Sequence, residues 1–144
     1  MEIKPLTSDF SVGPQIASGD IAALAKRGFR SLLSNRPDGE APDQPEWALL
    51  KAEAVEHGMK TAHAPVVASA ISDSDVASFR NMLKVLPRPV IAFCRTGTRA
   101  VMLWALADEE GLSADERIRI AAAAGYDLEP LRARLEQGTA PTQS

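Results

Sequence analysis

The sequence has little cysteine and little histidine. Its 144 residues include one cysteine, Cys94, and two histidines, His57 and His63. A single cysteine excludes an internal disulfide framework and any site in which several thiolates bind a metal. Two histidines leave little material for a catalytic zinc or iron centre. If the protein is an enzyme, we therefore expect chemistry that uses neither a metal nor another cofactor.

Long apolar runs and concentrated charge of one sign are also missing. No apolar stretch approaches the ~20 residues that a membrane span requires, and residues 1–10 lack the apolar core of a secretion signal. The formal net charge is -3, and the basic residues are scattered along the chain rather than gathered into a stripe. The sequence therefore argues against nucleic acid or a membrane as a partner and predicts a cytoplasmic protein.

Length and composition fit one globular domain. Hydrophobic residues make up 45% of the chain and charged residues 24%, close to the averages of soluble proteins. A chain of 144 residues normally buries enough apolar surface to fold unaided. We expect a single domain over residues 1–137, with two short helices between 112 and 137, and a disordered tail over residues 138–144.

Candidate strands and helices alternate along the chain. The apolar run 89–93 is typical of a central parallel strand, and residues 100–107 are apolar on nearly every side, as in a buried helix. Strands are predicted at 9–12, 29–34, 60–64 and 89–93, and helices at 21–27, 44–57, 76–86 and 100–107. This alternation predicts an α/β fold of three layers, with a mostly parallel sheet between helices on both faces.

The strongest functional signal lies between the most apolar strand and the buried helix. Cys94 follows that strand directly, at the position where open α/β sheets bind their ligands. In a short loop before a helix, backbone N–H groups can converge on one centre, where they bind an anion or stabilise a thiolate. Arg99 adds a planar pair of donors suited to oxyanions. We predict that Cys94 and Arg99 are catalytic, that the thiol is solvent-reachable, and that the substrate is bound by Arg95, Thr96, Gly97 and Thr98.

A polar loop at residues 35–40 offers a second candidate site. In the functional interpretation, Arg36 borders the Cys94 pocket and binds the anionic end of a substrate, while Asp38 pairs with Arg36 or acts as an acid. In the structural interpretation, the loop is a turn whose bend comes from Asp38 and Gly39. The sequence leaves both open. For His63, a structural hydrogen bond is favoured over a role in the pocket.

These residues resemble a known family. The segment Cys94–Arg99 resembles the active loop of rhodanese-type sulfurtransferases and, more distantly, the Cys-x5-Arg loop of cysteine-dependent phosphatases. Together with Gly28-Phe29, residues 35–40, Pro65-Val66 and residues 103–106, it resembles the beta-lactamase-hydrolase-like phosphatase-like domain. The resemblance implies a dual-specificity-phosphatase-like fold with a cysteine nucleophile. Because that domain also occurs fused to a persulfide dioxygenase, the resemblance further implies a separate dioxygenase as a partner.

Two departures from the phosphatase pattern bear on the reaction. Four residues separate Cys94 from Arg99, one fewer than in phosphatases, which predicts a tighter ring around a smaller group. Phosphatases of this fold also carry an acid on a loop roughly thirty residues before the cysteine, where it protonates the leaving alkoxide. Here residues 65–70 contain no carboxylate, and the next acid is Asp73. Transfer of sulfur needs no such acid, because its leaving group is already a stable anion.

Both departures favour a sulfurtransferase. We expect the Cys94 thiolate to take the outer sulfur of a small anionic donor, either thiosulfate or a small persulfide. The resulting persulfide then passes its sulfur to an external thiol or another nucleophilic acceptor, because the chain has no second cysteine. The alternative is a phosphatase that forms a phosphocysteine from a phosphate ester, with Asp38 or Asp73 as its acid. A second alternative is an anion-binding or partner-binding module without turnover.

Overall fold

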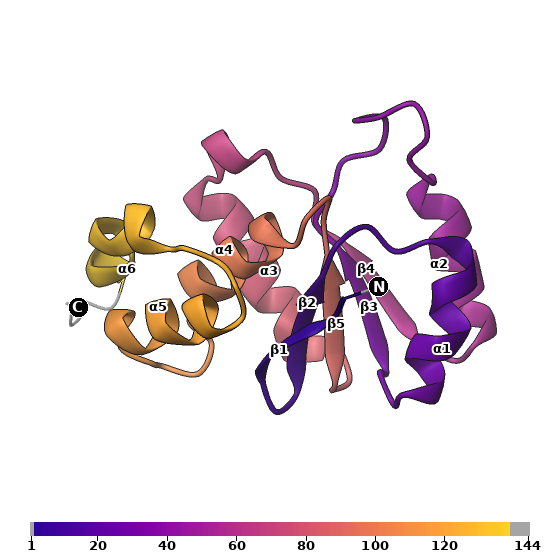
Figure 1. Cartoon of the computed structure of the whole chain (residues 1–144), viewed down its shortest axis with the longest axis horizontal. Coiled ribbons are helices and arrows are strands. Elements are labelled where there is room, and N and C mark those ends of the chain that lie inside the picture. Colours follow the sequence, from indigo (N-terminus) through magenta and orange to yellow (C-terminus); the bar gives the residue numbers. More distant parts are fainter. Residues whose placement is uncertain (1, 139–144) are drawn as a thin grey trace.

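A five-stranded sheet lies at the centre of the molecule (Figure 1). The computed structural model describes residues 2–138. The strands are β1 (Lys4–Thr7), β2 (Phe10–Gly13), β3 (Ser31–Ser34), β4 (Lys60–His63) and β5 (Val90–Phe93). Their spatial order is β1-β2-β5-β3-β4, and only the β1–β2 pair is antiparallel. The sheet is therefore mostly parallel, as the sequence predicts.

Helices cover both faces of this sheet (Figure 1). The helices α1 (Ile21–Lys26) and α2 (Trp47–Glu56) lie on one side, and α3 (Asp73–Val85) and α4 (Thr98–Ala107) lie on the other. Two further helices, α5 (Ala114–Ala123) and α6 (Arg132–Gly138), pack beside α4. Short 3-10 turns occur at Ser18–Asp20, Ala68–Ala70 and Glu129–Leu131. The three-layer architecture is confirmed.

The alternation of side chains along β5 decides where the following residue points. Val90 and Ala92 face the apolar cluster beneath α3 and α4, whereas Ile91 and Phe93 face the cluster beneath α1 and α2. Successive side chains of a strand point to opposite faces, so Cys94, the next residue, leaves the sheet on the α3–α4 side. This places the sulfur next to the beginning of α4.

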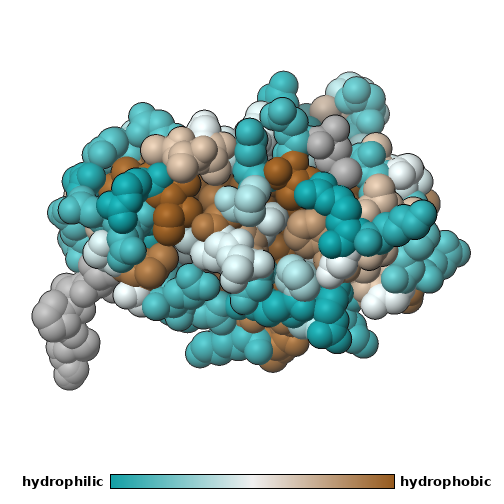
Figure 2. Space-filling model, turned by 60° about the horizontal axis from the view of Figure 1, so that its bottom comes forward, coloured by the Kyte–Doolittle hydropathy of each residue, from teal (hydrophilic) through white to brown (hydrophobic). Residues whose placement is uncertain are grey.

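Several local sequence signals produce the elements as expected. Ser72 accepts the N–H of Asp75 at 3.0 Å, and the Asp75 carboxylate accepts the N–H of Ser72, which gives α3 a capping box. The helix α4 is buried along most of its length, and Trp104 is part of the core. No helix within residues 2–138 has the length and apolar character needed to cross a membrane. Figure 2 shows a face on which hydrophilic residues predominate, with smaller apolar areas between them.

The structure differs from the sequence expectations in one additional strand and in the bounds of two helices. β1 was not predicted, because Pro5 and Lys4 give it no apolar alternation. The helix predicted from residue 44 begins at Trp47, since residues 44–46 follow the polar loop in non-helical form. Gly138 ends α6, and the rest of the predicted tail, residues 139–144, lies outside the described residues.

We expect replacement of the buried Phe79 by alanine to destabilise the fold strongly. The Phe79 ring is 0% exposed and meets the edge of Phe10 at a centroid distance of 6.2 Å, so its removal leaves a cavity between α3 and the sheet. Phe→Ala substitutions of this kind cost about 3–5 kcal/mol. Urea unfolding should show this loss for Phe79→Ala, whereas Val85→Ala, at a position 79% exposed on the same helix, should stay near the wild type. Equal losses in the two variants would contradict the assignment.

Candidate active site

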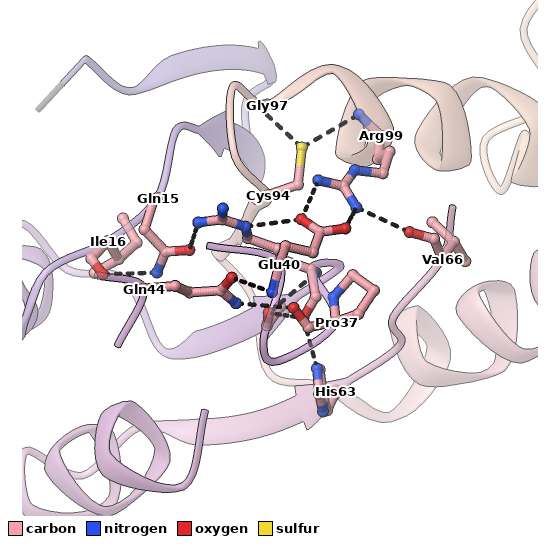
Figure 3. A network of polar contacts seen from close by, with 12 residues as sticks. Gln15, Ile16, Pro37, Glu40, Gln44, His63, Val66, Cys94, Gly97 and Arg99 are labelled. Carbon is pink, nitrogen blue, oxygen red and sulfur yellow. Dashed lines mark hydrogen bonds and ion pairs between the residues drawn. The ribbon is translucent and has the colours of Figure 1, made fainter. Parts of the chain in front are cut away.

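The loop after β5 encloses the sulfur of Cys94 (Figure 3). The backbone N–H of Gly97 donates to Sγ at 3.1 Å, and the N–H of Arg99 donates to it at 3.3 Å. Both donors belong to the first residues of α4 or its cap, so the positive end of the helix dipole also faces the sulfur. The predicted convergence of loop N–H groups is therefore present. Such donors stabilise the thiolate form of a cysteine.

The thiol is more enclosed than the sequence analysis predicted. Cys94 is only 1% exposed, because the loop folds over the sulfur and the neighbouring strands flank it. The prediction of a solvent-reachable thiol is therefore wrong. The surrounding side chains of Arg95, Thr96 and Thr98 are exposed, and the hydroxyls of Thr96 and Thr98 lie 3.0 Å apart.

Gly97 is required by two features of this loop. Its φ is +97°, in the left-handed region that side chains other than glycine rarely adopt. A Cβ atom at this position would also lie 2.2 Å from the Oη atom of Tyr126 and 3.3 Å from the carbonyl oxygen of Gly13. The glycine thus lets the chain turn into α4 while its own N–H points at Cys94.

Arg99 lies beside the sulfur and is held in place by a carboxylate. Its Nη1 and Nη2 donate to the two oxygens of Glu40 at 2.6 and 2.9 Å, and Nη1 also donates to the carbonyl of Val66 at 3.0 Å. The hydrogen bonds that Arg99 donates to Glu40 raise the pKa of Arg99 further, and the charge of Cys94 acts in the same direction against the effect of burial. The guanidinium is therefore permanently charged and fixed in orientation next to Cys94.

Glu40 was not predicted as a site residue, although it stands at the centre of the polar network in Figure 3. It accepts from Arg99 and also from Nε of Arg36, at 2.9 Å. The hydrogen bond from Arg99 is the main reason that the pKa of Glu40 is lowered from 4.5 to about 2. Burial opposes this shift, and the hydrogen bond from Arg36 adds to it. Arg36 and Glu40 are spaced i, i+4, but this spacing brings side chains together only in a helix, and residues 36–40 form a loop, so no sequence signal identified the pair.

Arg36 and Asp38 do not pair with one another, which corrects one expectation for the polar loop. The buried side chain of Arg36 bonds to Glu40, and its Nη1 donates to Oε1 of Gln15 at 2.9 Å. Asp38 instead accepts the backbone N–H of Trp47 at 2.9 Å, at the beginning of α2. Arg36 therefore borders the site, whereas Asp38 stabilises a helix end. Contact of either residue with a substrate stays a prediction.

His63 has the structural position that the sequence analysis favoured. Its Nε2 lies 2.9 Å from the carbonyl oxygen of Arg36, and its ring stacks on Trp47 with a centroid distance of 5.2 Å. The histidine thus supports the loop that carries Arg36 and Glu40. Within the described part of the chain, no group of three or more His, Cys, Asp or Glu side chains could hold a metal ion.

Two residues from outside the loop hold its carbonyl groups away from the sulfur. The N–H of Gln15 donates to the carbonyl of Arg95 at 3.2 Å, and the hydroxyl of Tyr126 donates to the carbonyl of Thr96 at 2.9 Å. The result is a loop whose N–H groups face Cys94 and whose oxygens face outward. Chemically, a thiol that faces N–H donors and a guanidinium is suited to act as a nucleophile on an anionic group.

Comparisons with known proteins agree with this geometry. Residues 2–111 match the model of the family described as "Beta-lactamase hydrolase-like protein, phosphatase-like domain". A beta-lactamase hydrolase-like protein of Xylella fastidiosa Temecula1 is 31% identical over 130 residues, which cover 89% of this chain but 30% of that protein. The chain thus spans about a third of the length of this curated relative.

Solved structures show the same likeness. A candidate phosphatase from Neisseria meningitidis Z2491 is 38% identical, with a TM-score of 0.85 over 96% of this chain and 99% of that one. Tk-PTP in its active form shares the fold at 16% identity, with a TM-score of 0.76 over 95% of each chain. On the family match and these relatives together, the chain belongs to the phosphatase-like domain family of beta-lactamase hydrolase-like proteins.

Proposed function

We propose that this chain is a cysteine-dependent phosphoric ester hydrolase that works through a phosphocysteine on Cys94. The observation that carries this proposal is the position of Sγ, which receives the N–H groups of Gly97 and Arg99 beside the fixed Arg99 guanidinium. These are the groups that a phosphoryl transfer requires, because charge is spread over three phosphoryl oxygens that need donors. The family match and the Neisseria structure support the same chemistry.

The proposed reaction has two steps. The Cys94 thiolate attacks phosphorus, an S–P bond forms, and the P–O ester bond breaks so that its electron pair leaves with the alcohol oxygen. Water then attacks phosphorus, the S–P bond breaks, and inorganic phosphate and the thiolate are released. In both steps the loop N–H groups and Arg99 hold the oxygens that do not react.

The carboxylates near the site narrow the substrate class. Glu40 is ionised at neutral pH because its pKa is about 2, so it carries no proton to give. Asp38 accepts from the N–H of Trp47, and Asp73 lies on α3 with Arg134 as its partner at 3.2 Å. A placed acid normally contributes about 10²–10⁴-fold when an alkoxide leaves. The preferred substrates are therefore aryl phosphates, whose leaving group departs readily as an anion.

A second candidate function is sulfur transfer from a small anionic donor. Two observations favour it: the loop has four residues between Cys94 and Arg99, and Cys94 is 1% exposed, so the ring fits a small group. The thiolate would attack the outer sulfur of thiosulfate, an S–S bond would form, and the original S–S bond would break with release of sulfite. An external thiol would then take the sulfur, because the chain has one cysteine.

Glu40 acts in this proposal as a positioning residue for Arg99. The Glu40 carboxylate and the Val66 carbonyl accept three of the five guanidinium N–H groups, so its plane is fixed. The other two N–H groups, on Nε and Nη2, are left to interact with Cys94 and with substrate oxygens. Because Arg36 and Gln15 hold the opposite side of the network, the loop after β3 and the beginning of α4 are joined. The catalytic arginine is therefore oriented before a substrate arrives.

The adduct on Cys94 tests the choice of reaction. After incubation with p-nitrophenyl phosphate and rapid acid quenching, intact-mass spectrometry should show a gain of one phosphoryl group, together with steady release of phosphate. Cys94→Ser should show neither. A gain of one sulfur atom after thiosulfate, without phosphate release from the ester, would instead support sulfur transfer. If no adduct forms and no turnover is detected, both reactions are contradicted and the binding module remains.

Replacing Arg99 by lysine should remove most activity although the charge remains. An ammonium group cannot donate two parallel hydrogen bonds, so we expect a loss of about 2–3 kcal/mol in transition-state binding. This corresponds to a decrease in kcat/KM of about 30-fold to 150-fold. Arg119→Lys, at an exposed position on α5, is the matched control and should retain wild-type kcat/KM. Near-wild-type activity of Arg99→Lys would show that Arg99 is not catalytic.

Glu40→Gln should have a lower free energy of unfolding than the wild type, by an amount that depends on pH. Since the folded protein lowers the pKa of Glu40 from 4.5 to about 2, the ionised carboxylate stabilises the fold above pH 4.5, and this contribution is lost as pH falls towards 2. Urea unfolding at a series of pH values should thus show the wild type more stable than Glu40→Gln near neutrality, with the difference shrinking in that window. Glu56→Gln corrects for the loss of one negative charge. A difference that is constant with pH would refute the ion-pair assignment.

A further inference from the structure

Tyr126 links the C-terminal helices to the loop around Cys94. It lies in the turn between α5 and the Glu129–Leu131 3-10 turn, beyond the residues 2–111 that match the family model. Its hydroxyl donates to the carbonyl of Thr96 at 2.9 Å, and its ring is half-buried against the core beneath α4. This contact joins parts of the chain that are thirty residues apart.

The bonded carbonyl belongs to the same peptide unit as the N–H that points at the sulfur. A peptide unit is planar and trans, so its C=O and its N–H point in opposite directions. In the Thr96–Gly97 unit, the oxygen is held by Tyr126 at 2.9 Å and the N–H donates to Sγ of Cys94 at 3.1 Å. Fixing the oxygen therefore fixes the N–H on the sulfur. Figure 3 shows the contact of Gly97 with the sulfur of Cys94.

Packing and charge strengthen this connection. The phenol lies so close to the loop that any Cβ atom at position 97 would meet Oη at 2.2 Å. Burial, and secondarily the charge of Cys94, raises the pKa of Tyr126, so the phenol stays protonated and remains a donor at neutral pH. A hydrogen bond accepted by a carbonyl also polarises its peptide and makes the N–H on the other side a stronger donor.

We propose that Tyr126 is a positioning residue that stabilises the thiolate of Cys94 through the Thr96–Gly97 peptide unit. Tyr126 does not touch the reacting atoms itself. The proposal rests on the proposed function only in that Cys94 reacts as a thiolate, and it holds equally for transfer of a phosphoryl group or of sulfur. It also assigns a role in the site to a segment outside the matched family region.

Tyr126→Phe tests the proposal, because it removes the hydroxyl and keeps the ring. In protein labelled with ¹³C at the Cβ of cysteine, the single cysteine gives one resonance, whose chemical shift follows ionisation of the thiol without any reagent entering the site. We expect the midpoint of this titration to move upward by about half a pH unit, a roughly threefold loss of thiolate below the midpoint. Thermal unfolding should confirm that the variant is folded.

Asp127→Ala is the matched control in the same turn. Its Oδ1 accepts the N–H of Glu129 at 3.0 Å, so this variant loosens the turn without removing the phenol. Any effect of the lost negative charge would move the midpoint downward, opposite to the expected effect of Tyr126→Phe. An unchanged midpoint in Tyr126→Phe would overturn the proposal. If the midpoint moves but wild-type Cys94 forms neither adduct, the role of Tyr126 stands and the proposed function fails.

Discussion

The ion pair between Arg99 and Glu40 is the interaction on which the geometry of the site depends. It joins the beginning of α4 to the loop after β3, and Arg36 and Gln15 extend it to the segment after β2. These segments meet because β2, β5 and β3 are adjacent parallel strands whose last residues, Gly13, Phe93 and Ser34, are in register. The sheet brings the three connections to one edge, and the charged network gives them a single arrangement.

This network also explains why the site can be strongly charged without being open. Two guanidinium groups beside a covered thiol would repel one another if nothing lay between them. The carboxylate of Glu40 accepts from both, so the positive charges of Arg36 and Arg99 are held beside the thiol with a negative charge between them. In addition, the backbone N–H of Gln15 and the hydroxyl of Tyr126 donate to the loop carbonyls and hold them away from the sulfur. Cys94 is thus surrounded by donors on every side that the loop provides.

Sequence reasoning identified what local patterns determine. The apolar strand, the cysteine, the glycine and the arginine all lie within residues 90–99, so their arrangement follows from one strand, one turn and one helix. Local patterns could not show that Glu40, rather than Asp38, pairs with Arg36. That pairing depends on how the loop after β3 folds back over the sheet. Local sequence patterns gave no indication of the Tyr126 contact either. The short strand β1 lacked an alternating pattern, and only its pairing with β2 makes it a strand.

The enclosure of Cys94 has a consequence for oxidation chemistry. A disulfide bond requires the Cα atoms of the two cysteines to come within about 7 Å of each other. A sulfur that is 1% exposed beneath its own loop cannot approach a cysteine of another folded copy so closely. The only thiol of the chain is therefore protected from covalent dimerisation while the loop covers it. Disulfide-linked dimers could consequently form only after the loop had opened, and their detection would show that it opens.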